Sequence, residues 1–439
     1  MKLEMWKRQQ IVRDKDRSLT DTVVLVGCGA FVAITVILVI LNGAINNNFI
    51  GKEDPFDNIM LWNFDLIGPT KLIAFLTLLI FILNLAILSY FAHFPKFMIW
   101  TLSIGCVVAL VGFGSSVAKI KIYFGFIAVF LAIAAVVLII SLQYEIPVVA
   151  AVFKESTMFI RDIWFICLLP VLTLFVASIA TRFFYQLCKI LTNPDSTVYF
   201  AEISLIFTIY SYIFVIIFIF ECQNFLVVGV TSKAYFDEDK CSMWQQMITI
   251  FWNLVRHHLG TVCLGTLLTI ANFLKVLVKN FKNIREETAK NLKNNGLEYQ
   301  VRSSYIYVIK NGTSLAVSAK TISTVLVSTN ADKLVPLKLY IIFVHAVWKF
   351  FLFLSFTWAF MFIAVEHPKL LTIKETKSSI KYAILLYIIG IVHGCVSSYE
   401  MVVDTLIVCM TIDYNEDKSD RKIGKMKNLI KIINSNFEK

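Results

Sequence analysis

The chain has 439 residues, of which 58% are hydrophobic and only 16% are charged, and its mean hydropathy is +0.74. So few charges could not cover so much apolar surface in water, which excludes a water-soluble globular protein and makes the lipid bilayer the expected solvent. The net charge of +11 does not indicate nucleic-acid binding, because the basic residues concentrate beside apolar segments, as the positive-inside rule describes.

Long apolar blocks follow one another along the chain, each with the roughly 20 residues that a helix needs to cross about 30 Å of hydrocarbon. Nine are clearly apolar: Thr22–Asn42, Lys71–Ala92, Phe97–Val117, Ile122–Gln143, Ile163–Phe183, Glu202–Val230, Arg256–Val278, Lys338–Val365 and Ile380–Thr411. A tenth block, Ser304–Thr329, is more polar and is either a spanning helix or an interfacial or re-entrant segment. The sequence therefore predicts an all-α, polytopic transmembrane helical bundle of about ten spans.

The polar segments predict a topology. Residues 1–21 precede an uncleaved anchor and, like the tail 412–439, are rich in basic residues, so both termini are expected in the cytosol around a transmembrane domain of residues 22–411. Segment 43–69 has Lys52 as its only basic residue, which suits the outside. Segment 279–303 is basic, which favours the cytosol, whereas the number of apolar blocks before it places it outside the cell. The side of the membrane on which this segment lies therefore stays open.

Nothing in the sequence indicates an enzyme, a cofactor or a metal centre. There is no P-loop and no HExxH motif, and no nucleophile–base constellation is visible. His257 and His258 do not chelate a metal together, because adjacent side chains on a helix diverge by about 100°. The nine cysteines are scattered without CxxC spacing, as expected of small residues that pack in apolar surroundings.

Five short runs, which occur in order over nearly the whole chain, resemble one family. They are Arg17–Asp21 (R-S-L-T-D), Val152–Ser156 (V-F-K-E-S), Arg256–Gly265 (R-H-H-L-G-T-V-C-L-G), Tyr305–Lys320 and Tyr399–Leu406 (Y-E-M-V-V-D-T-L). The runs are similar to those of the choline transporter-like protein family of multi-spanning solute carriers. Two features differ: the large extracellular loop common after the first span in animal members is absent, and Glu400 stands where glycine is usual.

The resemblance implies ten spans, cytosolic termini and a transporter, at the plasma membrane or alternatively in an organellar membrane. The implied substrate is choline or a related small organic cation such as ethanolamine, carried by alternating access to supply phospholipid synthesis. A channel-like or lipid-interacting multi-pass protein without choline transport is the alternative. The sequence does not indicate an oligomeric state.

A quaternary ammonium ion cannot donate a hydrogen bond, so its site needs aromatic faces and a nearby carboxylate. Tyr210 and Trp348 are the candidate aromatic residues, and Glu221 with Gln223 the candidate polar ones. Gln223 is the residue that the family keeps at its position, whereas Glu221 is peculiar to this chain.

Lys349 is the most unusual residue for a bilayer segment, because it lies eleven residues into its block, about 16 Å along a helix and close to the midplane. A charge there needs a partner. We expect Glu221 to face Lys349 while the site is empty and to be released when a cation enters. Lys349 thus either forms a structural ion pair or takes part in the transport cycle.

Glu400 and Asp404 lie one helical turn apart. If their span begins near Tyr382, both lie at the cytosolic boundary. Asp404 is then a candidate for holding the cytosolic side closed through a basic partner, and Glu400 has no expected role. Arg256 and His257, in the third family-like run, are further candidates for coupling or gating.

Overall fold

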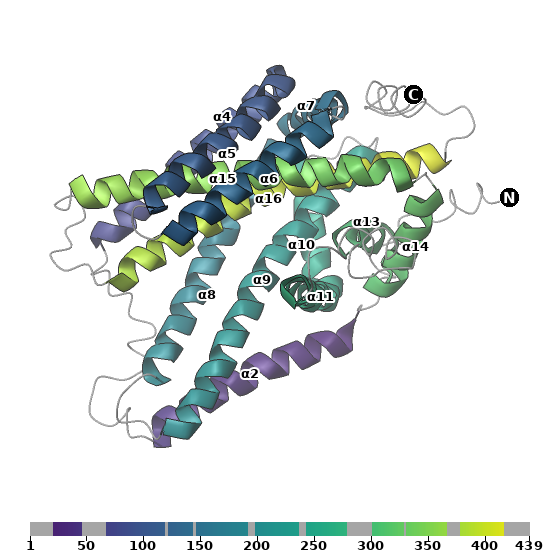
Figure 1. The fold of residues 1–439 in the computed structure, drawn as a ribbon. Helices are drawn as coiled ribbons and strands as arrows, with labels where there is room; N and C mark the ends of the chain where they lie inside the picture. The colour runs from purple at the N-terminus through teal and green to yellow at the C-terminus, as the bar shows by residue number, and fades with distance from the viewer. Residues whose placement is uncertain are drawn as a thin grey trace. The chain divides into compact units, whose positions relative to one another are not determined.

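The computed structural model describes residues 21–45, 67–118, 122–143, 146–191, 198–236, 243–278, 301–328, 331–366 and 378–416, and these residues form helices and short connections without strands. The predicted all-α, polytopic bundle is confirmed (Figure 1). The chain divides into two compact units: unit 1 contains residues 1–64 and 171–328, and unit 2 contains residues 65–170 and 329–439.

Unit 1 is built around three helices that contact one another, α2, α9 and α11. Its elements are α2 (Thr22–Ile45), most of α8 (Leu169–Leu191), α9 (Val198–Phe236), α10 (Met243–Asn253), the π-helical turn η4 (Leu254–His258), α11 (Leu259–Val278), α13 (Val301–Asn311) and α14 (Leu315–Ser328). Apolar side chains of α2 and α8 form one buried core, which contains Val39, Phe184, Leu187 and Leu191. The hydroxyl groups of Thr35 and Ser211 lie 2.8 Å apart and join α2 to α9 where water is excluded.

Unit 2 is built on the long helices α15 and α16, which pack against each other (Figure 1). Its elements are α4 (Ile67–His93), α5 (Pro95–Ala118), α6 (Ile122–Leu142), α7 (Ile146–Asp162), the 3₁₀ turn η3 (Trp164–Leu168), α15 (Ala331–Glu366) and α16 (Ser378–Glu416). Helix α7 is not among the predicted apolar blocks, because it has only 17 residues, including charged ones. It packs against α4, α5, α15 and α16, so it belongs to the core of the unit.

Local breaks interrupt the helical pattern of the described residues. The 3₁₀ turn η3 precedes Pro170, the second residue of α8, where the missing N–H of proline costs no helical hydrogen bond. Helices α10 and α11 join through the π-helical turn η4. Gly312, with φ of 64°, separates α13 from α14, so the tenth apolar block consists of two short helices, and its place in the membrane stays a prediction.

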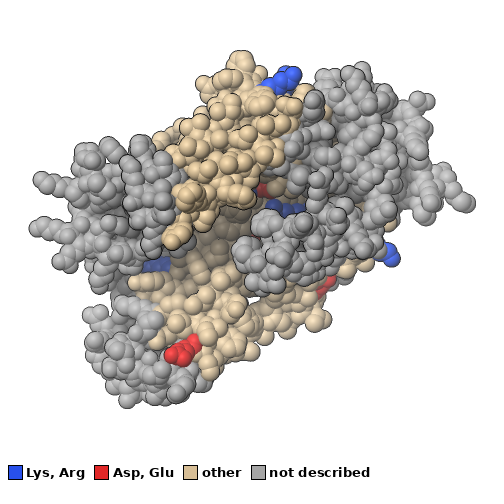
Figure 2. All heavy atoms as spheres, in the orientation of Figure 1, with Lys and Arg blue, Asp and Glu red and all other residues tan. Residues whose placement is uncertain are grey.

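The outer surfaces of these helices are strongly apolar. Large hydrophobic side chains such as Val23, Phe126 and Leu172 are more than half exposed, and in Figure 2 the described surface carries few charged atoms. Seven described segments are long and apolar enough to cross a membrane: Thr22–Leu41, Pro95–Gly112, Trp164–Cys188, Glu202–Phe236, Trp244–Ala271, Tyr340–Thr357 and Ile388–Ile412. The apolar faces are those that lipid would cover.

The predicted topology depends mainly on residues that lie outside the described ranges. These are residues 1–20, most of segment 43–69, residues 279–300 and residues 417–439. The predicted sides of the membrane for these segments therefore stay predictions.

Candidate functional site

Unit 2 contains five aromatic side chains in mutual contact, which we call the aromatic cluster: Phe91 of α4, Phe153 of α7, His345 and Trp348 of α15, and Tyr399 of α16. Each is at most 2% exposed. The centroids of contacting rings lie 4.9 to 6.4 Å apart, within the range of favourable aromatic pairs. Four helices therefore meet at one aromatic centre.

Local sequence spacing and one hydrogen bond hold the aromatic cluster together. His345 and Trp348 lie three residues apart on α15 and so share one helix face. The Tyr399 hydroxyl donates to the carbonyl oxygen of Phe153 over 3.1 Å and lies 3.1 Å from Thr157 Oγ1. These contacts tie α16 to α7 through two of the family-like runs, those that begin at Val152 and Tyr399.

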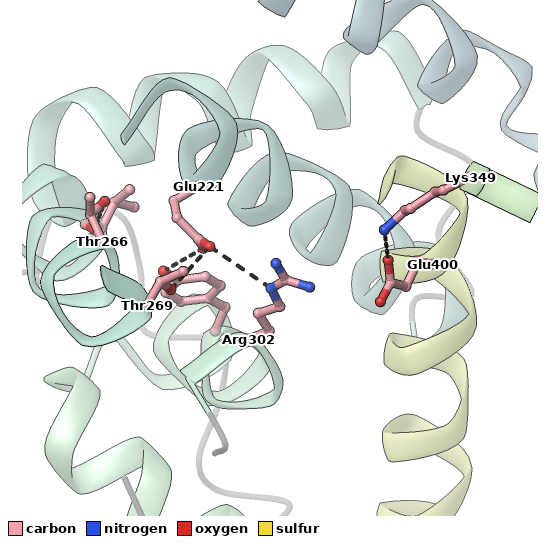
Figure 3. A network of polar contacts seen from close by, with 8 residues as sticks. Glu221, Thr266, Thr269, Arg302, Lys349 and Glu400 are labelled. Atoms are coloured by element: carbon pink, nitrogen blue, oxygen red, sulfur yellow. Dashed lines mark hydrogen bonds and ion pairs between the residues drawn. The ribbon is translucent and has the colours of Figure 1, made fainter. Parts of the chain in front are cut away.

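An ion pair adjoins the aromatic cluster. Lys349 Nζ lies 2.5 Å from Glu400 Oε2 (Figure 3), and these residues directly follow Trp348 and Tyr399 in the chain. The expected pairing of Lys349 with Glu221 is wrong, because the partner of Lys349 comes from α16 of the same unit. The expected position of Glu400 at the cytosolic boundary stays a prediction.

Asp404 lies one turn beyond Glu400 on the same helix. Its Oδ1 atom is buried without a hydrogen-bond partner among the described residues, so the expected basic partner is not among them. Lys349 directly follows Trp348 on α15, and Glu400 and Asp404 lie within about one turn and a half of Tyr399 on α16. One basic and two acidic residues therefore lie next to the aromatic cluster along these two helices.

Two polar atoms of the aromatic cluster have no partner among the described residues. His345 Nδ1 lies 2.8 Å from the carbonyl oxygen of Ile341, whereas His345 Nε2 and Trp348 Nε1 are buried without hydrogen bonds. Because an unpaired buried polar atom costs about 1–3 kcal/mol, such atoms commonly mark functional positions.

A pocket of unit 2 reaches the aromatic cluster at Tyr399. The pocket is small, with room for about one water molecule, and its polar lining comes from Asn84, Ser398 and Tyr399. The pocket lies among α4, α7 and α16, with η3 and the first residues of α8 closing one side.

Unit 1 contains a different charged site, the Glu221 centre, formed by Glu221, Thr269, Arg302 and Tyr305. Figure 3 labels the first three of these residues. Glu221 is 2% exposed and accepts hydrogen bonds from Tyr305 Oη over 3.2 Å and from Thr269 Oγ1 over 3.3 Å. Arg302 Nε lies 3.8 Å from the same carboxylate. A buried carboxylate is tolerated here because both of its oxygen atoms have partners.

Asp21 joins two further parts of unit 1. Its Oδ2 atom accepts hydrogen bonds from Thr261 Oγ1 over 2.9 Å and from the backbone N–H of Leu315, the first residue of α14, over 3.3 Å. Asp21 has φ of 53°, a conformation that aspartate tolerates better than most residues. The remaining three family-like runs therefore meet at this side chain, and sequence reasoning gave Asp21 no role.

The other predicted site residues belong to unit 1. Gln223 is buried on α9, two residues beyond Glu221, whereas Tyr210 on the same helix is 63% exposed and joins neither centre. Arg256 in the π-helical turn lies over the ring of Trp252, 4.6 Å from its centroid, and His257 lies beside His258. Their roles in binding, coupling or gating, like that of Glu221, stay predictions.

Sequence reasoning missed several residues of these centres. Phe153, Tyr305 and Tyr399 lie inside the family-like runs, so the runs were the available signal. His345 is a titratable residue near the middle of an apolar block, which is itself unusual, while Phe91 looks like any lipid-facing phenylalanine. Among the described residues no group of three or more His, Cys, Asp or Glu side chains could hold a metal ion.

The fold and the site define a class: a polytopic helical membrane protein with an aromatic and charged centre inside its apolar segments. Residues 126–415 match the sequence profile of the family described as plasma-membrane choline transporter. The chain belongs to this choline transporter family.

The similarity to individual proteins of this family is low. The chain is 26% identical to choline transporter-like protein 1 of Torpedo marmorata over 49% of its own length and 35% of the relative's. The same protein of Rattus norvegicus is also 26% identical, over the same shares. Choline transporter-like protein 2 of Dictyostelium discoideum is 26% identical over 52% of this chain and 38% of the relative. The chain thus spans little more than a third of the length of these relatives.

Proposed function

We propose that this chain is a carrier that moves choline, or a related small organic cation such as ethanolamine, across a membrane by alternating access and so supplies phospholipid synthesis. The aromatic cluster of unit 2 is the observation that carries the proposal. Membership of the choline transporter family supports it.

The chemistry of choline fits an aromatic site. Its trimethylammonium group has a permanent positive charge and no N–H to donate, so recognition depends on ring faces and on negative charge nearby. Trp348 and Tyr399 supply two of the ring types that bind cations most strongly. Both are held in place by buried neighbours, which lowers the ordering cost of binding.

The charges beside the aromatic cluster suit a monovalent cation. In their usual ionised forms, Lys349, Glu400 and Asp404 carry one positive and two negative charges. An entering cation balances the excess negative charge without any proton transfer. In the absence of substrate, Lys349 is paired with Glu400. When a cation enters, Asp404 is the carboxylate that balances its positive charge.

The plasma membrane is the proposed location, with both termini in the cytosol. The description of the family supports the location, and the basic residues at both ends of the chain support the orientation. Protease protection of terminal tags in sealed cells tests the orientation: digestion of either tag from outside would contradict it.

Uptake into liposomes that contain the purified protein tests the function. We expect saturable uptake of labelled choline that excess unlabelled choline or ethanolamine reduces. Liposomes preloaded with unlabelled choline should take up the label faster, because a carrier with bound choline reorients its site across the membrane faster than an empty carrier does. A linear flux without this acceleration would favour a channel, and no flux above empty liposomes would contradict transport of choline.

A further inference from the structure

Helix α10 and the π-helical turn η4 of unit 1 present an apolar face outward, which we call the α10 face. Five large side chains on it are 41% to 56% exposed: Trp244, Ile248, Phe251, Trp252 and Val255. Their spacing of mostly three or four residues places them on one side of the helix. Ile250, on the other side, is buried and fills the space beside Gly229 of α9. The α10 face therefore points away from α9.

Arg256 adds a permanent positive charge to the end of the α10 face. Its side chain is exposed, and its guanidinium group lies over the ring of Trp252, 4.6 Å from the centroid. Among the described residues it forms no ion pair with a carboxylate. Because a guanidinium group stays charged in proteins and has five N–H donors, the stacked ring orients it and leaves its donors available to an anion.

The length of the following helix favours a position of Arg256 near a membrane surface. The apolar segment Trp244–Ala271 is longer than one crossing requires. Helix α11 alone has 20 residues, about 30 Å of helix, which is enough to cross the hydrocarbon core. Arg256 lies three residues before α11, and tryptophan side chains such as those of α10 are typical of the membrane–water interface. Phospholipid phosphate groups lie at the same depth.

We propose that the α10 face is a docking site for an anionic phospholipid, whose phosphate group accepts hydrogen bonds from Arg256 while its acyl chains cover the exposed apolar side chains. The planar guanidinium group matches the oxygen atoms of a phosphate in a bidentate arrangement. An anionic phospholipid is preferred over phosphatidylcholine, because the ammonium group of phosphatidylcholine already compensates its phosphate. This lipid site does not depend on the proposed transport of choline.

Native mass spectrometry of the purified full-length protein tests the lipid site, with phosphatidylglycerol as the anionic probe and phosphatidylcholine as the neutral one. Arg256→Gln should lower the affinity for phosphatidylglycerol about fivefold, the contribution of one basic residue near an anionic membrane surface. Arg256→Lys should lower it about twofold, because the charge remains but the planar fork is lost. Lys320→Gln, which removes an exposed charge from α14 of the same unit, is the matched control and should change nothing. Equal affinities for phosphatidylglycerol in Arg256→Gln and the unaltered protein would overturn the proposal.

Photo-crosslinking locates the lipid and does not require Arg256 to be replaced. The variant Phe251→p-benzoylphenylalanine, on the α10 face, should capture phosphatidylglycerol about fivefold more than phosphatidylcholine. The same crosslinker in place of Tyr210, which is 63% exposed on α9, should capture both lipids equally. Equal capture from position 251, or crosslinks from it to a second copy of the chain instead of to lipid, would overturn the proposal.

Discussion

Glu221 in unit 1 and Glu400 in unit 2 are both carboxylates inside apolar segments, and each lies beside a basic side chain. The neighbours of Glu221 are hydrogen-bond donors, so both of its oxygen atoms have protein partners. Around Glu400 the neighbours are aromatic rings, and Asp404, His345 and Trp348 each keep a buried polar atom without a partner among the described residues. Completed hydrogen bonding indicates a structural centre, whereas unused capacity beside ring faces indicates a ligand site. The predictions below test this distinction.

Loss of one charge of the unit 2 ion pair should have the largest effect. Lys349→Met leaves the Glu400 carboxylate as an uncompensated charge inside an apolar helix, so the free energy of unfolding should fall by about 3–5 kcal/mol. The double variant Lys349→Met/Glu400→Leu should recover most of this loss, because no unpaired partner remains. Thermal unfolding in detergent measures both. A single variant as stable as the unaltered protein would show that the pair does not compensate charge.

Loss of the Asp21 carboxylate should disconnect the three elements that meet there in unit 1. We expect Asp21→Ala to lower the free energy of unfolding by about 2 kcal/mol, through two lost hydrogen bonds to a charged acceptor and strain at positive φ. Asp21→Asn keeps an acceptor and tolerates the conformation, so its loss should be smaller. Equal melting temperatures for the two variants would contradict this role.

Replacement of the Trp348 ring should weaken cation binding in unit 2. Trp348→Leu should reduce choline affinity about tenfold, because a desolvated cation–π contact contributes up to about 2 kcal/mol. Trp348→Phe opens a similar space but keeps a ring face, so its affinity should stay within about threefold. Titration calorimetry measures both, and identical losses would indicate a packing effect alone.

Glu221→Gln should have the smallest effect and is the sharpest test of the comparison. Removal of the charge weakens two hydrogen bonds and the contact with Arg302, so stability should fall by about 1 kcal/mol. Choline affinity should not change, since the variant leaves unit 2 intact. A tenfold loss of affinity in a folded variant would move the cation site to unit 1, as the sequence first suggested.

The sequence predicted the helical membrane fold and the family, because both depend on patterns that persist along the chain. It also singled out Lys349, since a mid-span lysine is costly whatever surrounds it, whereas the binding role given to Trp348 stays a prediction. It could not predict that Glu400 is the partner of Lys349, because which faces of α15 and α16 meet is decided by packing between distant segments.

The local irregularities at Gly312 and Asp21 could not be predicted from the sequence either. The block Ser304–Thr329 reads as one helix unless Gly312 is known to adopt a positive φ. Asp21 precedes the first apolar block and looks like a helix-capping residue. Its contacts with Thr261 and Leu315 depend on residues 240 and 294 positions away, a separation at which sequence periodicity contains no information.

The π-helical turn η4 sets a rotational register. A π turn accommodates one residue more than an α turn, and one residue corresponds to about 100° around a helix axis. If Leu254–His258 instead continued as a regular α-helix with every residue kept, α11 would be rotated by about 100° relative to α10. Thr261, Thr269 and Cys263 would then leave their present faces together. The π turn absorbs one surplus residue and so keeps both the Asp21 contact and the Glu221 centre aligned.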